Sequence, residues 1–201
     1  MPLRVIAGSA KGRKLRLVPG DSTRPIMDRV KEALFSILGS YIVGTRFLDL
    51  FAGTGSVGIE ALSRGAEHAL FTDRERAALD TIRTNVRTAQ VETRAEIRMA
   101  DAFELLKQTP SAPYDYIYIA PPQYQGFWRT ALELLDANPA WLDDDGIVIV
   151  QIDPHEQEDV ALKNIISYDV RRYGKTLLWF FEKVVPKTAS ETDTEKDSTH
   201  E

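Results

Sequence analysis

An acidic residue and a run of glycines stand together where a short apolar segment ends. Asp49 lies inside the apolar run of residues 47–51, and the pattern Gly53-x-Gly55-x-x-Gly58 follows at once. Glycine lets the backbone turn sharply and approach a ligand closely, and a helix that begins after such a turn offers unpaired N–H groups. A strand, a glycine turn and a helix N-terminus together are typical of the nucleotide-binding edge of a doubly wound sheet.

Two classes of cofactor use this edge, and the acid inside the strand discriminates between them. Asp73 stands where the dinucleotide fingerprint places a ribose-binding acid, about twenty residues beyond the glycines. Asp49 would repel a pyrophosphate but suits the ammonium group of a methionine. The pattern therefore predicts S-adenosylmethionine rather than NAD. An NAD-linked oxidoreductase stays open as an alternative, as does an Asp49 that only fixes the glycine loop.

Two further acids are expected at the same edge of the sheet. Asp73 follows a predicted strand at residues 68–72, where it can accept both hydroxyls of a ribose or cap the next helix. Asp101 follows a predicted strand at residues 95–99. It is expected either to bond an adenine amino group or to cap a short helix, and the sequence does not decide between the two roles.

A stiff loop is the candidate for the acceptor side of the site. Residues 114–119 predict a fourth strand, and the loop Ala120-Pro121-Pro122-Gln123-Tyr124 follows it. The two prolines fix φ. Tyr124 offers an aromatic face on which an unpaired or flipped base can stack, whereas Trp128 is interpreted as a core residue.

The N-terminal part of the chain is basic, although the whole chain carries a net charge of -5. Residues 1–46 hold nine lysines and arginines against three acids. Residues 3–8 and 14–18 predict a β-hairpin with a cationic tip that can contact phosphates, the alternative being a merely solvated hairpin. The residues expected to bind RNA are Arg4, Lys11, Arg13, Lys14, Arg24 and Arg29.

The remaining elements complete an α/β fold, a doubly wound Rossmann-like sheet. Residues 26–39, 56–64 and 75–88 predict helices, and residues 167–173 and 176–184 predict a C-terminal antiparallel strand pair. The acids of Asp143-Asp144-Asp145-Gly146 are interpreted as a solvated turn rather than a metal site. We expect three parts: a basic β-hairpin extension at 1–24, a catalytic domain at 25–185 and a disordered acidic tail at 186–201.

Composition excludes several classes of protein. The chain has 201 residues and no cysteine, so disulfides and thiolate metal sites are absent. No apolar run approaches the roughly 18 residues that a membrane span needs. We expect a cytoplasmic monomer that has no membrane partner and binds no metal.

Several segments together resemble a known family. Asp49-x-Phe51-x-Gly53-x-Gly55, Asp73 and a Pro-Pro-x-Tyr loop resemble class I S-adenosylmethionine-dependent methyltransferases. The stretches Arg4-Val5-Ile6-Ala7-Gly8, Gly12-Arg13-Lys14-Leu15 and Arg24-Pro25-x-x-Asp28-Arg29 resemble the RsmD family more specifically. The resemblance covers about residues 3–184 and is closest over the first 65 or so.

The resemblance implies an activity and a set of contacts. Members transfer a methyl group to the exocyclic N2 of one guanine in small-subunit ribosomal RNA, on a partly assembled 30S particle. The residues expected to bind the cofactor are Asp49, Phe51, Ala52, Gly53, Thr54, Gly55, Asp73, Arg74, Asp101 and Ala102. Those expected at the reacting group are Ala120, Pro121, Pro122, Gln123 and Tyr124.

The acceptor loop departs from the family pattern, which normally begins Asp-Pro-Pro-Tyr or Asp-Pro-Pro-Phe. Here Ala120 replaces the acid, and Gln123 precedes the aromatic residue. The first side chain of the loop and a proline carbonyl orient the target amino group, and such positioning carries much of the rate. Ala120 offers only its carbonyl, while Gln123 can supply a neutral acceptor. A different amino-group substrate, or an RNA-binding protein that has lost the chemistry, remains an alternative.

Overall fold

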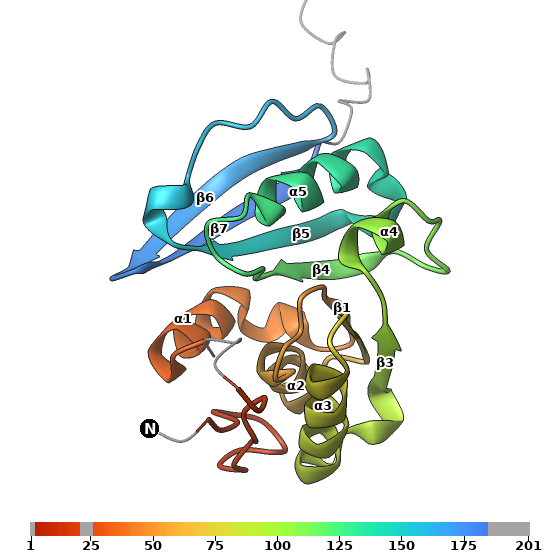
Figure 1. The fold of residues 1–201 in the computed structure, drawn as a ribbon, viewed down its shortest axis with the longest axis vertical. Coiled ribbons are helices and arrows are strands. Elements are labelled where there is room, and N and C mark those ends of the chain that lie inside the picture. Colours follow the sequence, from red (N-terminus) through yellow and green to blue (C-terminus); the bar gives the residue numbers. More distant parts are fainter. Residues whose placement is uncertain (1–2, 21–25, 185–201) are drawn as a thin grey trace, which may run out of the picture.

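A seven-stranded sheet organises the computed structural model, which describes residues 3–20 and 26–184 (Figure 1). The strand order is β3-β2-β1-β4-β5-β7-β6. Five strands are parallel, and they are β1 (Arg46–Asp49), β2 (His68–Asp73), β3 (Ala95–Met99), β4 (Tyr114–Ile119) and β5 (Leu142–Ile152). β7 (Thr176–Lys183) runs antiparallel between β5 and the edge strand β6 (Ile165–Tyr173).

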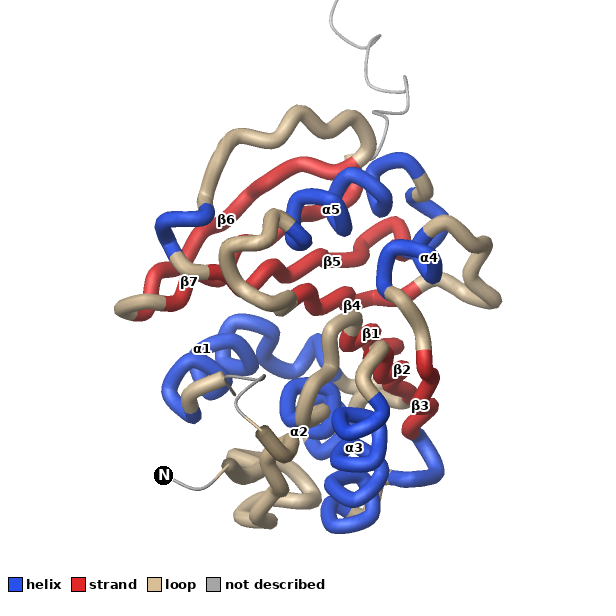
Figure 2. Tube along the Cα trace, viewed as in Figure 1, coloured by secondary structure: helices blue, strands red, loops and turns tan. Residues whose placement is uncertain are grey.

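Helices cover both faces of this sheet (Figure 2). One face carries α1 (Asp28–Leu38), α2 (Ser56–Ser63) and α3 (Arg76–Ala89), and the other carries α4 (Ala102–Leu106) and α5 (Phe127–Ala137). Short 3₁₀ helices occur at Gly39–Ile42, Glu92–Arg94, Pro139–Trp141 and Pro154–Glu156. Successive side chains of β1 point to opposite faces of the sheet, so the sheet separates two hydrophobic clusters: Phe47 packs into the cluster on the first face and Leu48 into the cluster on the second.

The order of the strands reverses between β1 and β4. Chain connections from these two strands leave the sheet in opposite directions, which opens a crevice outside their carboxyl ends. The loops after β1, β2 and β4 gather there. The doubly wound sheet and the C-terminal antiparallel pair predicted from the sequence are therefore confirmed.

The N-terminal segment, residues 3–18, pairs with itself but forms no regular strand within the described residues. One isolated antiparallel bridge joins Arg4 to Lys14, and Leu15 N donates to Leu3 O at 2.8 Å. The backbone N–H groups of Ile6 and Ala7 donate instead to the Glu60 carboxylate, at 2.8 and 2.9 Å. The two arms of the segment are also joined by the bond from Val5 N to Arg13 O at 3.0 Å, while the donors of Ile6 and Ala7 turn to α2, and the regular β-hairpin stays a prediction.

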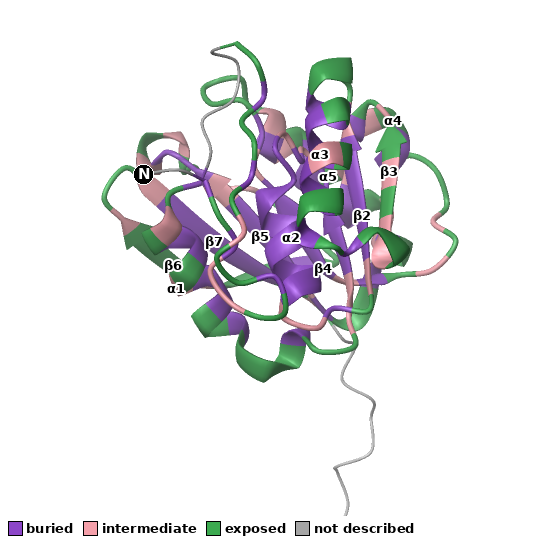
Figure 3. Ribbon diagram, turned by 90° about the horizontal axis from the view of Figure 1, so that it is seen from below, coloured by how far each residue is buried: buried purple, intermediate pink, exposed green. Residues whose placement is uncertain are grey.

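Buried polar groups hold this segment on α2, all of whose residues are buried (Figure 3). Glu60 also lies 3.6 Å from the Nζ of Lys31, which donates to Arg4 O at 2.6 Å. Burial lowers the pKa of Lys31, and the Glu60 charge opposes that shift. Further along, Asn85 of α3 bonds both backbone groups of Arg16. The segment is thus fixed to two helices that follow it in the chain.

The acidic run Asp143–Asp145 lies in the first part of β5 and not in a turn, so that prediction is wrong. The register of β4 and β5 jumps there, because Tyr114 pairs with Leu142 but Tyr116 pairs with Ile147. The extra residues form an irregularity that exposes all three acids. No group of three potential metal ligands exists among the residues that the structure describes.

Two of the expectations fall on residues that the structure does not describe. The predicted tail at 186–201 and Arg24 lie outside the described residues. Within residues 3–20 and 26–184, no helix has both the length and the apolar character needed to cross a bilayer.

Candidate functional site

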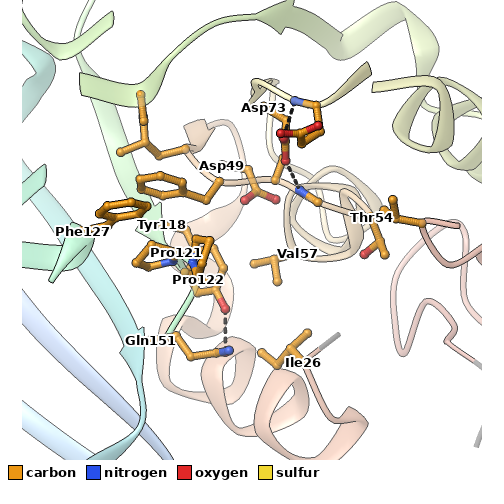
Figure 4. A pocket seen from close by; sticks show the side chains of 18 of the residues that line it. Ile26, Asp49, Thr54, Val57, Asp73, Tyr118, Pro121, Pro122, Phe127 and Gln151 are labelled. Carbon is orange, nitrogen blue, oxygen red and sulfur yellow. Dashed lines mark hydrogen bonds between the residues drawn. The ribbon is translucent and has the colours of Figure 1, made fainter. Parts of the chain in front are cut away.

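A cavity of about 750 Å³ opens at the carboxyl ends of β1, β2, β4 and β5 (Figure 4). That size suits a nucleoside cofactor together with part of a second ligand. In Figure 4, Asp73 lies at one end and Gln151 at the other, with Asp49 between them. Nine of the ten predicted cofactor residues line it: Asp49, Phe51, Ala52, Gly53, Thr54, Asp73, Arg74, Asp101 and Ala102. The tenth, Gly55, caps α2 in a left-handed conformation.

Asp49 is the buried acid of this cavity, with 2% of its surface exposed. Its Oδ2 accepts a hydrogen bond from the backbone N–H of Gly58 at 3.1 Å, while Oδ1 has no hydrogen-bond partner among the described residues. Burial raises the pKa of Asp49 to about 7, against the Gly58 hydrogen bond and with help from the Asp73 charge. A cation bound beside it would favour the ionised form.

Gly58 brings α2 close enough to the sheet for this contact. A Cβ built on Gly58 would lie 2.4 Å from Cε1 of Phe71 on β2, a distance that real Cβ contacts essentially never show. The third glycine of the fingerprint therefore serves helix–sheet packing. A larger residue would push the helix N-terminus away from Asp49.

Asp73 ties two of the cavity loops together. Its Oδ2 accepts from Gly53 N at 3.0 Å, and its Oδ1 accepts from Glu75 N at 2.9 Å. The N-cap of α3 is Glu75 rather than Asp73, so the capping alternative does not hold for this residue. The carboxylate is half-buried and lines the cavity, where its remaining lone pairs can accept from a ligand.

Asp101 caps α4 and lines the cavity at the same time. Its Oδ1 accepts from Phe103 N at 2.9 Å and from Glu104 N at 3.1 Å. Oδ2 has no hydrogen-bond partner within the part of the chain that the structure describes. The two roles left open by the sequence are therefore compatible, since capping occupies one oxygen only.

An aromatic wall adjoins these acids. Phe103 contacts Phe51 edge-to-face at 6.1 Å and Phe127 at 5.4 Å between ring centroids, and all three rings line the cavity. The sequence singled out Phe51 but gave Phe103 no role. Its position in the first turn of a helix, two residues after Asp101, is the signal that could have found it, because that turn faces the same crevice.

The loop after β4 divides between two cavities. Ala120, Pro121, Pro122 and Gln123 line the main cavity as expected, whereas Tyr124 does not. Tyr124 has φ +60°, and its backbone N–H donates to Oε1 of Glu156 at 2.7 Å. It borders a second hollow of about 180 Å³ with Trp128 and His155, among others. The side chain expected to stack on a base thus lies outside the lining of the main cavity.

The 3₁₀ turn that follows β5 anchors this loop. Asp153 and Glu156 form a reciprocal capping box. Hydrogen bonds from the backbone and ring of His155, and another from the side chain of Tyr124, lower the pKa of Asp153. Both acids of the turn therefore contact Tyr124, and they fix the direction in which the loop leaves β4.

Several cavity residues were missed by the sequence reasoning. They come from β4, from β5, from the turn before β7 and from the loop before α1: Tyr118, Gln151, Lys175, Thr176, Ile26 and Met27. Gln151 is the one polar residue in an apolar strand run, and that interruption is a usable signal.

The predicted RNA-binding residues have different surroundings. Arg4 forms an ion pair with Asp28 at 2.9 Å, and Arg13 donates to Thr88 O at 2.7 Å, so both have structural partners. Lys11, Lys14 and Arg29 are exposed and form no salt bridge with any described residue. The trio Lys11, Lys14 and Arg29 is available to a polyanion.

Comparisons with known proteins agree with this geometry. Residues 3–182 match the family model described as Conserved hypothetical protein 95. The putative rRNA methyltransferase YlbH of Bacillus subtilis is 36% identical over 183 residues, covering 90% of this chain and 99% of that protein. Ribosomal RNA small subunit methyltransferase D of Escherichia coli K12 is 34% identical over 149 residues, 74% of each chain. The solved structure of the putative methyltransferase yhhF from Escherichia coli has a TM-score of 0.81 at 30% identity, covering 91% of this chain and 98% of that one.

Proposed function

This chain belongs to the RsmD family, and on that premise we propose that it transfers a methyl group from S-adenosylmethionine to the N2 of a guanine in small-subunit ribosomal RNA. The observation that carries the proposal is the cavity itself. The carboxylates of Asp49, Asp73 and Asp101 line it, and a Pro-Pro loop with a neutral amide stands beside them.

The cofactor end fits S-adenosylmethionine. Asp49 offers Oδ1 to the ammonium group, Asp73 offers its lone pairs to the ribose hydroxyls, and Asp101 offers Oδ2 to the adenine amino group. None of these carboxylates forms a salt bridge with a described residue. The aromatic wall suits a purine ring. The same charges oppose a pyrophosphate, which disfavours NAD.

When bound, the cofactor supplies an electrophilic methyl group, so the protein's task is orientation. The lone pair of the target nitrogen must point at that methyl carbon. Carbonyl oxygens of the loop Ala120–Pro122 and the amide oxygen of Gln123 are acceptors for its N–H bonds. One N–C bond forms, one S–C bond breaks and one proton leaves the nitrogen for solvent. Neither a covalent enzyme intermediate nor a metal is required.

A second candidate is an amino-group methyltransferase that acts on a different base. It is favoured by the absence of an acid at position 120, where the family pattern has one. The same cofactor end would serve both candidates, so only the acceptor separates them.

The test is methylation of small-subunit particles from cells that lack the enzyme, followed by nucleoside analysis. N2-methylguanine is the expected product. Gln123→Ala should lower the rate by about 10-fold to 100-fold because the amino group loses an acceptor, whereas Gln125→Ala, an exposed glutamine of the same loop, should not. Methyladenine or methylcytosine as the product would replace the proposal with the second candidate.

A further inference from the structure

Two side chains at the acceptor end of the cavity, Tyr118 and Gln151, are hydrogen-bonded to each other and have no part in the proposed methyl transfer. The hydroxyl of Tyr118 donates to Oε1 of Gln151 at 2.6 Å (Figure 4). Tyr118 is 2% exposed, and burial together with the nearby Asp49 raises its pKa well above the ordinary value. The hydroxyl therefore stays protonated and acts as a donor to the amide.

The pair lies directly beside the Pro-Pro loop. In the parallel register of β4 and β5, Ile119 is opposite Val150. The next residue of each chain is Ala120 and Gln151, so these two stand abreast, about 4.8 Å apart if the strand spacing continues. A guanine whose N2 amino group bonds the carbonyl of Ala120 would thus present O6, at the other end of its Watson–Crick edge, toward Gln151.

The hydroxyl of Tyr118 determines which end of the amide meets a ligand. Oε1 of Gln151 is occupied, and Nε2 has no hydrogen-bond partner in residues 3–20 and 26–184. Gln151 is half-buried and lines the cavity. The side chain consequently presents N–H donors rather than an acceptor at this point.

We propose that Gln151 is a specificity-determining residue that donates a hydrogen bond to the O6 carbonyl of the target guanine, with Tyr118 as the residue that positions it. The inference rests on the proposed guanine-N2 activity and adds the feature that selects the base. Guanine carries an acceptor at position 6, whereas adenine and 2,6-diaminopurine carry an amino group there. Two donors that face each other away from water are both left unpaired, and binding sites reject such a mismatch strongly.

The decisive substrates differ along that edge: 2,6-diaminopurine has an amino group in place of O6 and an unprotonated N1 in place of the N1–H of guanine. Particles are reconstituted with ribosomal RNA ligated to carry either guanine or 2,6-diaminopurine at the target nucleotide, and both bases keep the amino group that accepts the methyl. The wild type should methylate guanine about 100-fold faster under single-turnover conditions. Gln151→Glu should invert the preference, because a carboxylate accepts where the amide donates.

Two more variants separate specificity from structure. Tyr118→Phe keeps the ring but lets the amide rotate, so the preference should fall to about 10-fold or less. Gln151→Met replaces the amide by an apolar side chain of similar size, which removes both the donor and the acceptor. The methylation rates of the guanine and 2,6-diaminopurine particles should therefore converge. Gln157→Glu, an exposed glutamine outside the cavity, is the matched control. Binding of S-adenosylhomocysteine should be unchanged in each folded variant.

The outcomes distinguish the inference from its premise. Equal rates for the two bases with the wild-type protein would overturn the role of Gln151. A Gln151→Met variant that slows both substrates by the same factor would also overturn it, since that pattern indicates a structural role. A wild type that leaves the guanine particle unmethylated would instead break the proposed function.

Discussion

The two ends of the cavity are built from different chemistry. The cofactor end carries three carboxylates from the ends of β1, β2 and β3, held by backbone N–H groups. Neutral groups form most of the acceptor end, namely two prolines, two glutamines and a tyrosine. Carboxylates suit a ligand that carries a positively charged group. Neutral hydrogen-bonding groups suit a base, because their fixed directions distinguish one base from another. Under the proposed function, affinity and specificity would belong to separate walls.

Asp49→Asn should produce the largest change and should affect only the cofactor end. Loss of the charge that meets the ammonium group should weaken S-adenosylmethionine binding by about 100-fold or more. Calorimetry measures this, with the exposed Asp145→Asn as the control. Binding within threefold of the wild type, on the order of 0.7 kcal/mol, would contradict the assignment of Asp49.

The pH dependence of the ligand-free protein should depend on the same residue. The folded pKa of Asp49 is about 7, above its ordinary value of 3.8, so its favourable neutral form is fully present below 3.8 and is lost as pH rises through 7. Asp49→Asn should therefore stabilise the ligand-free protein at pH 8, by on the order of 2–4 kcal/mol. Denaturant unfolding at pH 5 and pH 8 gives the comparison.

Cofactor binding should show the opposite trend with pH. The ionised carboxylate binds the ammonium group, so affinity should decrease by up to about tenfold for each unit below pH 7. A flat profile between pH 5.5 and 8 in the wild type would show that Asp49 is not the titrating ligand.

Glu156→Ala should impair the acceptor end of the cavity and leave the cofactor end intact. It removes the acceptor for the Tyr124 backbone and so loosens the Pro-Pro loop, which should lower kcat by about tenfold while cofactor affinity is unchanged. Glu158→Ala is the matched control, because that residue forms an ion pair only with Arg129 among the described residues. An equal loss of cofactor affinity would mean that the two walls are not independent.

Replacing both Lys11 and Lys14 by glutamate should have the smallest effect. These side chains lie on the N-terminal segment, and loss of phosphate contacts should raise KM for particles about threefold to tenfold, with a weaker dependence on salt. Lys163→Glu, an exposed lysine before β6, serves as the control. A change in kcat at saturating particle concentration would argue that the pair does more than bind RNA.

The contrast also explains what could be predicted from sequence. The cofactor end is contiguous: one strand, one turn and one helix carry most of its residues, and the strand ends bring Asp73 and Asp101 to the same edge. Parallel topology alone places those acids, so their position follows from chain order.

The acceptor end could not be predicted in the same way. Tyr118 and Gln151 meet only because β5 pairs with β4 in one particular register, and a buried strand reads as apolar whichever register it adopts. The direction of Tyr124 depends on its positive φ and on Glu156, thirty-two residues further along the chain. Similarly, the acids at 143–145 have the composition of a turn, and only the irregular pairing with β4 shows that they belong to a strand.

The attachment of the N-terminal segment has a consequence for how the chain acquires its structure. Residues 6 and 7 bond to a carboxylate 54 and 53 residues ahead, and Arg13 bonds to a carbonyl 75 residues ahead. Contacts of such separation carry a large loop-closure entropy and form late. The N-terminal segment is therefore expected to be among the last parts of the fold to dock. Until it docks, Glu60 lacks the N–H donors of Ile6 and Ala7, so the placement of Lys11 and Lys14 depends on α2 and α3 being formed.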